Sequence, residues 1–193
     1  MNDYADDIRQ AVAVLRKGGV ILYPTDTVWG IGCDARNAEA VAKVFKIKQR
    51  ADSKALITLV GSLAQLERTV DEIPDVAYSL IEYSERPLTI VYDRPAPGAR
   101  LAEALLADDG SLGVRLTTEE FSAALCRAFG APLVSTSANI SGKPTPATFA
   151  EISDEVRSAV DYICTSRRDE TKPAAASTVM RLGAGGEFKI LRP

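Results

Sequence analysis

The amino-acid sequence predicts an α/β domain with a twisted, mixed β-sheet and helices around it. Segments with helical spacing of apolar residues alternate with short apolar runs along the chain. Several of these runs follow one another without an obvious helical crossover, which favours a mixed sheet over a purely parallel one. The length of 193 residues, with 46% hydrophobic residues, is ordinary for one globular core. We therefore expect a single domain over residues 1–193, with no additional C-terminal domain.

Helices are predicted where apolar residues recur at three- and four-residue spacing between capping signals. Gly18-Gly19 ends the first helix, and Asn37 is a suitable N-cap for the second. Pro74 suits the first turn of the third helix, while Thr117 or Thr118 is expected to cap the fourth. The predicted helices are Asp3–Lys17, Asn37–Ile47, Ile73–Glu85, Thr118–Phe129 and Thr148–Val160.

Short apolar runs between glycine, proline or polar residues predict the strands. They are Val20–Tyr23, Ala55–Val60, Leu88–Tyr92, Leu112–Leu116, Leu133–Val134, Ser177–Leu182 and Phe188–Leu191. Pro24 ends the first strand, because proline lacks the N–H that a strand ladder uses. The polar, glycine-rich segment Thr25–Gly32 and the segment Pro95–Gly98 are expected to be loops. Thr165–Ala176 has little periodicity and is the expected mobile loop.

Composition excludes several classes of protein. No apolar stretch approaches the roughly 20 residues of a membrane-spanning helix, and the acidic start Met1–Asp7 is unlike a secretory signal. We therefore expect a cytoplasmic protein without a membrane partner. Cys33, Cys126 and Cys164 are odd in number and far apart, which indicates reduced thiols. The formal net charge of −3 counts against general binding of nucleic acid.

The chain contains no histidine. This removes the commonest general base, the commonest zinc ligand and every catalytic triad or dyad that needs an imidazole. Any catalysis must therefore rest on lysine, arginine, carboxylates, hydroxyls and backbone amides.

A basic cluster lies where the second predicted helix ends. Lys48, Arg50 and Lys54 occupy the helix end and the loop beyond it, preceded by Lys43 and Lys46. Cations at a helix C-terminus interact favourably with the helix dipole, so a solvated helix end explains the cluster when it is considered alone. The same junction lies at the rim of an α/β sheet, where ligands commonly bind and where arginine and lysine suit phosphate.

A polar segment, Ser135–Thr145, directly follows the predicted strand at Leu133–Val134. Its small donors suit a polar turn and an anion-binding loop about equally, and spacing alone does not separate the two. The phosphate-binding patterns G-x-x-x-x-G-K-[ST] and G-x-G-x-x-G do not occur.

Two shorter segments are also candidates for a site. Tyr23–Gly30 fits a strand-ending turn with Trp29 in the core. In the strand that follows Ser111, a period of two places Ser111, Gly113 and Arg115 on one face. An arginine on a strand is more often an exposed edge residue than a ligand.

Five motifs in one order connect these segments: Pro24–Gly30, Lys48-x-Arg50, Val114-Arg115, Ser137–Pro144 and Ser177–Val179. Together they resemble the YrdC domain family, the threonylcarbamoyl-AMP synthases and their YciO-like members. The resemblance spans roughly Val12–Arg192. The pairing of K-x-R with a distant S-x-N is specific to this family, and P-T-D-T-x-x-G strengthens it.

The resemblance implies a large, concave, basic cavity in the sheet and the activity of an L-threonylcarbamoyladenylate synthase. Such a nucleotidyltransferase makes threonylcarbamoyl-AMP and pyrophosphate from L-threonine, bicarbonate and ATP. Its product passes to downstream tRNA threonylcarbamoyl-transfer proteins, which modify the adenosine next to the anticodon to N6-threonylcarbamoyladenosine. A carbamate of threonine is the nucleophile, so placement and charge neutralisation supply most of the acceleration without a histidine.

The resemblance also implies roles for single residues. Residues with a catalytic role are Lys48, Arg50, Ser137 and Asn139. Residues around ATP are Arg50, Lys54, Ser111, Ser137, Asn139, Thr145 and Arg192. Residues around threonine are Thr27, Arg115, Ser135 and Ser177, with Arg115 suited to the carboxylate.

The sequence offers no carboxylate cage for a metal ion. Mg²⁺ is therefore expected to be held mainly by the phosphates of ATP and by water, with Asp26 the acidic residue best placed to help. The chain departs from the family pattern near Leu59, where many members carry a histidine. Two alternatives stay open: a paralogous enzyme that forms a carbamoyl-adenylate from another amine, and an RNA-binding, translation-associated module for tRNA or double-stranded RNA.

Overall fold

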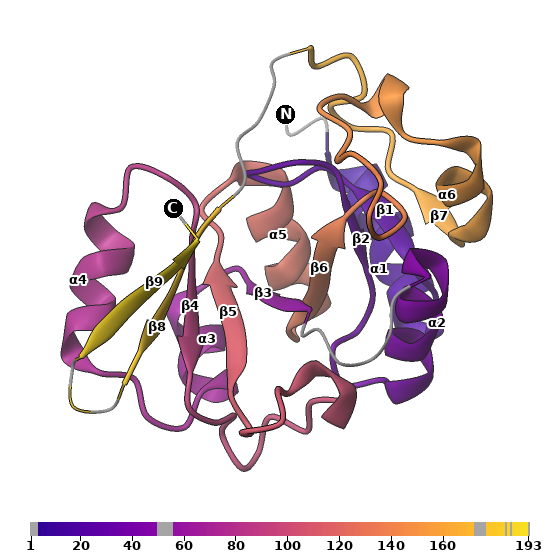
Figure 1. Cartoon of the computed structure of the whole chain (residues 1–193). Helices are drawn as coiled ribbons and strands as arrows, with labels where there is room; N and C mark the ends of the chain where they lie inside the picture. Colours follow the sequence, from indigo (N-terminus) through magenta and orange to yellow (C-terminus); the bar gives the residue numbers. More distant parts are fainter. Residues whose placement is uncertain (1–3, 50–55, 172–176, 184, 186, 193) are drawn as a thin grey trace.

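The computed structural model describes residues 4–49, 56–171, 177–183, 185 and 187–192. Within these residues, one mixed sheet has the strand order β7-β1-β2-β6-β3-β5-β4-β8-β9, and helices surround it (Figure 1). The pairs β1–β7, β3–β5 and β4–β8 are parallel, and the other neighbouring strands are antiparallel. The predicted α/β class with a mixed sheet is confirmed.

The helices follow the predicted ones in most places. They are α1 (Ala5–Arg16), α2 (Ala38–Lys48), α3 (Leu63–Thr69), α4 (Asp75–Tyr83), α5 (Glu120–Phe129) and α6 (Asp154–Ala159), with 3₁₀ turns η1 (Glu103–Leu105) and η2 (Phe149–Glu151). Asn37 caps α2 as predicted, because its side chain accepts a hydrogen bond from the Ala40 N–H at 3.0 Å. In the described part of the chain, no helix is long and apolar enough to cross a membrane.

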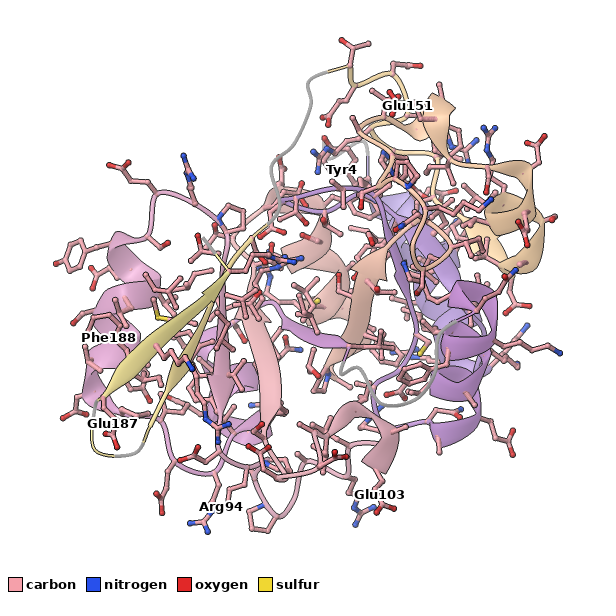
Figure 2. The ribbon with its side chains drawn as sticks, in the orientation of Figure 1. Tyr4, Arg94, Glu103, Glu151, Glu187 and Phe188 are labelled. Atoms are coloured by element: carbon pink, nitrogen blue, oxygen red, sulfur yellow. The ribbon has the colours of Figure 1, made fainter. Side chains whose placement is uncertain are left out.

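The strands are β1 (Ile21–Tyr23), β2 (Gly30–Gly32), β3 (Ile57–Val60), β4 (Leu88–Tyr92), β5 (Leu112–Leu116), β6 (Leu133–Ser137), β7 (Tyr162–Ile163), β8 (Thr178–Leu182) and β9 (Phe188–Arg192). The predicted bounds of β4 and β5 are correct. Strand β9 forms one edge of the sheet, where Phe188 is 67% exposed (Figure 2).

Strand β2 lies inside the segment Thr25–Gly32 that was expected to be a loop. A Cβ atom on Gly32 would lie 2.6 Å from a ring carbon of Tyr23 and 2.6 Å from the carbonyl oxygen of Val134. Glycine therefore lets the Tyr23 ring pack against this strand, whereas in the sequence it resembles a loop signal. Strand β6 also continues through Ser137, so the predicted polar loop Ser135–Thr145 begins as a strand.

The predicted helix Thr148–Val160 is wrong in its middle, where the chain divides into η2 and α6. Ser153 caps α6, and Arg157 Nε donates to the carbonyl oxygen of Ile152 at 2.7 Å. A side-chain donor and a cap thus satisfy the backbone groups that a continuous helix would pair internally.

The expected caps of two other helices are also corrected. Glu119 caps α5 in place of Thr117 or Thr118, because its two carboxylate oxygens accept from the N–H groups of Phe121 and Ser122. Pro74 is the extended N-cap residue of α4 and precedes its first turn. The short elements α3, η1 and β7 were not predicted.

Two groups of buried apolar residues hold the sheet. The larger one packs α1, α2 and α5 against β1, β2 and β6 and includes Leu15, Val44 and Phe121. The smaller one packs α3 and α4 against β4, β5 and β8 and includes Leu66 and Ile90. All three cysteines are buried and free, as predicted. The central strands β6, β3 and β5 join the two halves, and the candidate site lies along them.

Candidate active site

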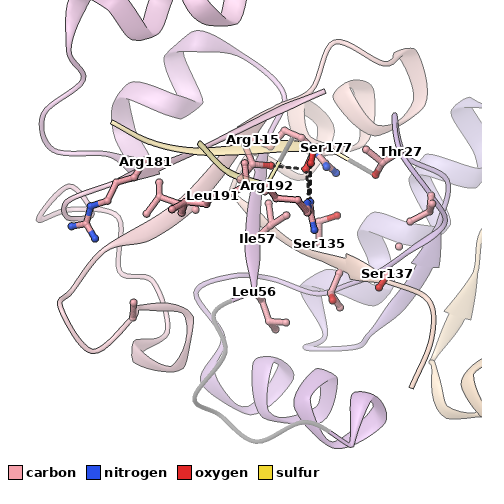
Figure 3. Close-up of a pocket in the computed structure, with 18 of the residues that line it drawn as sticks. Thr27, Leu56, Ile57, Arg115, Ser135, Ser137, Ser177, Arg181, Leu191 and Arg192 are labelled. Carbon is pink, nitrogen blue, oxygen red and sulfur yellow. Dashed lines mark hydrogen bonds between the residues drawn. The ribbon is translucent and has the colours of Figure 1, made fainter. Parts of the chain in front are cut away.

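A cavity of about 720 Å³ lies over the sheet, with walls from β2, β5, β6, β8 and β9 and the loops between them (Figure 3). Eight of the residues that the sequence predicts for the site line this cavity. They are Thr27, Ser111, Arg115, Ser135, Ser137, Thr145, Ser177 and Arg192. Lys48 and Asn139 lie against this wall through Ser137, whereas Arg50 and Lys54 lie outside the described residues.

Strand β5 extends along the cavity from one end to the other. Ser111, Gly113 and Arg115 line it, as the period of two predicts, while Leu112 and Val114 pack into the core. Ser111 and Arg115 are four positions apart along the extended chain, or roughly 13 Å. We call the part around Thr27, Arg115, Ser135 and Ser177 the inner end. The part around Asp109, Ser111, Arg181 and Leu191 is the outer end.

Arg115 is buried at the inner end, with 3% of its surface exposed. The alternative of an exposed edge arginine is therefore wrong, because β5 lies between β3 and β4 in the middle of the sheet. Arg115 Nη2 lies 3.2 Å from Asp26 Oδ1, which compensates the buried charge. Its Nε is buried and has no hydrogen-bond partner among the described residues.

Asp26 is the counter-ion of Arg115. Burial raises the pKa of Asp26, and the positive charge of Arg115 opposes that rise. Because its carboxylate is engaged by the arginine, and Asp26 is absent from the described cavity wall, the geometry does not support the expected help with Mg²⁺. Among the described residues, no group of three or more acidic or cysteine side chains is arranged to hold a metal ion.

Thr27 reaches the inner end from the loop between β1 and β2. The Thr25 hydroxyl lies 3.0 Å from the Thr27 hydroxyl, accepts from the Thr27 N–H at 3.1 Å and donates to the carbonyl oxygen of Val28 at 2.7 Å. These bonds form a compact turn, in which Thr25 fixes where Thr27 points.

Ser177 and Arg192 meet beside the inner end. The Arg192 guanidinium donates to the Ser177 carbonyl oxygen at 2.9 and 3.1 Å and to its hydroxyl at 3.1 Å (Figure 3). Ser177 Oγ also lies 3.1 Å from Thr89 Oγ1. Strand β9 thus brings a residue from the end of the described chain next to Ser177.

Lys48 forms a buried cluster with Ser137 and Asn139. Its Nζ donates to the Ser137 carbonyl oxygen (2.5 Å), the Asn139 Oδ1 (3.1 Å) and the Ser137 hydroxyl (3.3 Å). Only 2% of Lys48 is exposed, so the alternative of a solvated helix end is wrong for this residue. Asn139 Nδ2 in turn donates to the carbonyl oxygen of Lys143 at 2.7 Å, which secures the turn after β6.

The outer end contains residues that the sequence did not single out. Arg181 pairs with Asp93 (3.1 Å) and Asp109 (2.6 Å), and Asp109 accepts from the Ser111 hydroxyl at 2.6 Å. Hydrogen bonds from Ser111 and Arg181 hold the pKa of Asp109 far below its ordinary value. The signal that could have identified Arg181 is period two in β8, since Ser177, Val179 and Arg181 all line the cavity.

The charge of the described cavity wall is mixed. Arg115, Arg181 and Arg192 line it together with Asp108 and Asp109. The basic character expected of the whole cavity stays a prediction, because Arg50 and Lys54 lie outside the described residues.

Leu59 lies in the sheet beside the inner end. It is fully buried and pairs with Arg115 across the β3–β5 ladder. An apolar side chain therefore stands next to the buried arginine at the position where a histidine was expected from the family pattern.

The fold and the site together define a class of protein: a mixed α/β protein with a buried arginine, clustered hydroxyls and a Lys-Ser-Asn cluster along one cavity. The model of the Sua5/YciO/YrdC family, described as "Telomere recombination", matches residues 13–193. The chain belongs to this family.

Two similar proteins carry the same name. A threonylcarbamoyl-AMP synthase of Halorhodospira halophila is 38% identical over 161 residues, which are 83% of each chain. A threonylcarbamoyl-AMP synthase of Stenotrophomonas maltophilia is 39% identical over 155 residues, 79% of this chain and 82% of the relative.

Solved structures have the same fold. P. abyssi Sua5 complexed with L-threonine superposes with a TM-score of 0.83 at 28% identity, over 96% of this chain and 53% of that one. E. coli YciO superposes with a TM-score of 0.79 at 28% identity, over 96% of this chain and 87% of that one. The chain therefore spans about half the length of this Sua5 structure and most of YciO.

Proposed function

We propose that the protein is an L-threonylcarbamoyladenylate synthase, which converts L-threonine, bicarbonate and ATP into threonylcarbamoyl-AMP and pyrophosphate. The relatives at 38–39% identity carry this name. The proposal rests on one observation. The same cavity contains a buried arginine with hydroxyls around it at one end, and it borders the cluster of Lys48, Ser137 and Asn139. The names of these relatives do not favour the RNA-binding alternative or another amine substrate.

The inner end is the proposed site for threonine. Arg115 supplies a guanidinium donor to the carboxylate, and its partner Asp26 keeps the buried pair neutral. Thr27, Ser135 and Ser177 supply hydroxyls on the surrounding walls, and each of these three residues is at least nine-tenths buried. Small, buried and fixed donors suit a small polar substrate.

The remaining walls are the proposed site for ATP. Ser111, Ser137, Thr145 and Arg192 line them, and Asn139 orders the turn that follows Ser137. Arg50 and Lys54, predicted for the phosphates, complete the proposed set. Mg²⁺, if held mainly by the phosphates and water, would neutralise their charge when bound.

The chemistry follows from the residue types. The neutral threonine amine combines with bicarbonate to give a carbamate and water. A carbamate oxygen then attacks the α-phosphorus of ATP, and the bond to the bridging oxygen breaks as pyrophosphate leaves. Lys48, Arg50, Ser137 and Asn139 are proposed to place the phosphates and offset the charge that develops there. No step requires an imidazole.

The cellular setting is part of the same proposal. We infer one domain over residues 1–193 that works in the cytoplasm and passes its product to tRNA threonylcarbamoyl-transfer proteins. The adenylate is a reactive mixed anhydride, so a partner that consumes it promptly would protect it from hydrolysis.

Pyrophosphate release from ATP tests the function. We expect release only when L-threonine and bicarbonate are both present, together with a product that has the mass of threonylcarbamoyl-AMP. Release without threonine, or with another amine in its place, would contradict the proposal.

Asn139→Ala tests the Lys48 cluster. We expect it to reduce release by about 100-fold, because the Lys48 ammonium and the turn after β6 both lose a fixed partner. Ser141→Ala is the matched control from the same turn, since Ser141 is exposed and makes a backbone bond to the Lys48 carbonyl oxygen. If Asn139→Ala releases pyrophosphate as fast as Ser141→Ala and the wild type, Asn139 is not part of the site.

A further inference from the structure

Arg167 belongs to the segment that follows β7. Its backbone φ is +59°, in the left-handed region that residues other than glycine seldom adopt. Such a conformation persists where surrounding contacts impose it. The contacts of the Arg167 side chain therefore need an explanation.

The guanidinium of Arg167 connects three segments of the chain. Its Nε and Nη2 donate to the two carboxylate oxygens of Glu170 at 2.8 and 2.7 Å. Its Nη1 lies 2.8 Å from Glu119 Oε1 and donates to the Thr25 carbonyl oxygen at 3.2 Å. A planar guanidinium is the side chain that can satisfy such spread acceptors at once.

One of these contacts leads to the inner end, and another leads to helix α5. Thr25, held at its carbonyl oxygen, holds Thr27 through its hydroxyl. Glu119 caps α5 through the N–H groups of Phe121 and Ser122. Arg167 thus fastens the loop that carries Thr27 to the beginning of a core helix.

The backbone around Arg167 is fixed independently. The buried carboxylate of Asp7 in α1 accepts from the N–H groups of Thr165 (2.9 Å) and Ser166 (2.7 Å). It also accepts from the Tyr162 hydroxyl at 2.7 Å. These bonds place the start of the segment, so the Arg167 guanidinium is directed at the loop with little freedom.

A second hollow, of about 540 Å³, separates this segment from the loop. Thr27, Val28 and Ala147 line both this hollow and the main cavity. The wall at Thr27 and Val28 is therefore thin, with space on both sides. Arg167 lines the second hollow and contacts the loop there through the Thr25 carbonyl oxygen.

We infer that Arg167 is a positioning residue for the amino-acid substrate, because it clamps the Thr25–Thr27 turn against Glu119. This inference rests on the proposed function. Arg167 does not line the main cavity, so it acts through Thr27 and not by touching threonine. Loss of the clamp should weaken the site for the amine while it leaves the nucleotide end unchanged.

The neighbouring residue provides a matched control. Arg168 belongs to the same segment, but its guanidinium donates to the carbonyl oxygens of Ile163 and Cys164 and stacks over Phe149. Arg168→Gln therefore removes an equally engaged arginine without releasing the Thr25–Thr27 turn.

The test compares the steady-state constants of Arg167→Gln, Arg167→Lys and Arg168→Gln in the pyrophosphate assay. For Arg167→Gln we expect the KM for threonine to rise about tenfold, with the KM for ATP within about twofold of wild type. For Arg167→Lys, the KM for threonine should lie between those of the wild type and Arg167→Gln, because lysine keeps the charge but lacks the planar set of donors. Arg168→Gln should leave the KM for threonine within about twofold.

Each outcome separates the inference from the proposed function. If the wild type shows threonine-dependent release and the two glutamine variants share one KM for threonine, the clamp is refuted and the synthase stands. A parallel rise in the KM for ATP would also refute it, since a merely structural role would affect both substrates. Wild-type release that does not depend on threonine would refute the proposed function itself.

Discussion

The two ends of the cavity differ in how their polar groups are held. At the inner end, Arg115, Ser135 and Ser177 are almost completely buried, and the partners of Arg115 and Ser177 come from segments far apart in the sequence. At the outer end, Arg181 is 40% exposed and Leu191 is 52% exposed. A closed, braced end suits recognition of a small amino acid, whereas an open end admits a larger and more flexible nucleotide.

The comparison predicts different consequences of substitution at the two ends. A change at the inner end removes a desolvated contact and leaves a buried partner unsatisfied. A change at an exposed residue of the outer end, such as Arg181, is compensated by water and screened by salt. The three predictions that follow run from the largest expected effect to the smallest.

Arg115→Gln should have the largest effect. It removes the proposed carboxylate donor, so threonine-dependent pyrophosphate release should fall about 100-fold. It also leaves Asp26 buried without its counter-ion, which should cost about 3–5 kcal/mol of unfolding free energy. Denaturant unfolding and the pyrophosphate assay measure the two effects.

Arg127→Gln is the control for Arg115→Gln. Arg127 is exposed in α5 and donates to the carbonyl oxygen of Gly61 at 3.1 Å, away from the cavity. The Arg127→Gln variant should lose some unfolding free energy and keep threonine-dependent pyrophosphate release. If both arginine variants lose activity in proportion to stability, the inner end has no special role.

Asp7→Asn should have an intermediate effect, because Asp7 supports the inner end from outside. Loss of the charged acceptor for Tyr162, Thr165 and Ser166 should cost about 2 kcal/mol of unfolding free energy at pH 7. Denaturant midpoints at fixed m-value measure this difference.

The effect of Asp7 should depend on pH. Burial raises the pKa of Asp7, and hydrogen bonds from Ser166 and Tyr162 lower it. The lowering is the larger effect, so the pKa of Asp7 lies below its ordinary value. A carboxyl whose pKa is depressed in the folded state contributes stability above its unfolded pKa and loses it as pH falls. The gap between wild type and Asp7→Asn should therefore shrink below about pH 4. A gap that widens there would contradict this assignment.

Arg181→Ala should have the smallest effect. Its ion pairs with Asp93 and Asp109 are solvent-exposed, so thermal unfolding should shift by less than about 2 °C. The KM for ATP should rise by no more than about threefold, and more at low salt than at high salt. A large loss of activity would mean that the outer end is as tightly held as the inner end.

Local patterns were enough to predict much of the fold. The bounds of β4 and β5 follow from apolar runs with clear ends, and the cap of α2 follows from Asn37. The sequence failed where tertiary packing overrides local preference. Gly32 lies in a strand because the Tyr23 ring occupies the space where a side chain would lie. Glu119 caps α5 in place of Thr117 or Thr118, because its carboxylate accepts from two helix N–H groups.

The candidate site could be predicted as a set of residues but not as a set of contacts. Periodicity indicated which face of β5 bears Arg115, yet nothing local indicates its ion pair with Asp26. From the sequence alone, Lys48 fits a solvated helix end. In the fold, the end of β6 and the turn after it place Ser137 and Asn139 against Lys48. Arg167 carries no motif at all, because its role depends on three segments that only the fold brings together.

Two buried serines give the most direct test of the division between the two ends. Ser177 at the inner end and Ser111 at the outer end are 2% and 3% exposed, and each is hydrogen-bonded. Ser177→Ala should raise the KM for threonine about fivefold and that for ATP by no more than about twofold, because Arg192 keeps its bonds to the Ser177 carbonyl oxygen, whereas Ser111→Ala should do the reverse. If both variants raise the KM of the same substrate, the cavity does not separate amino acid from nucleotide in the way we propose.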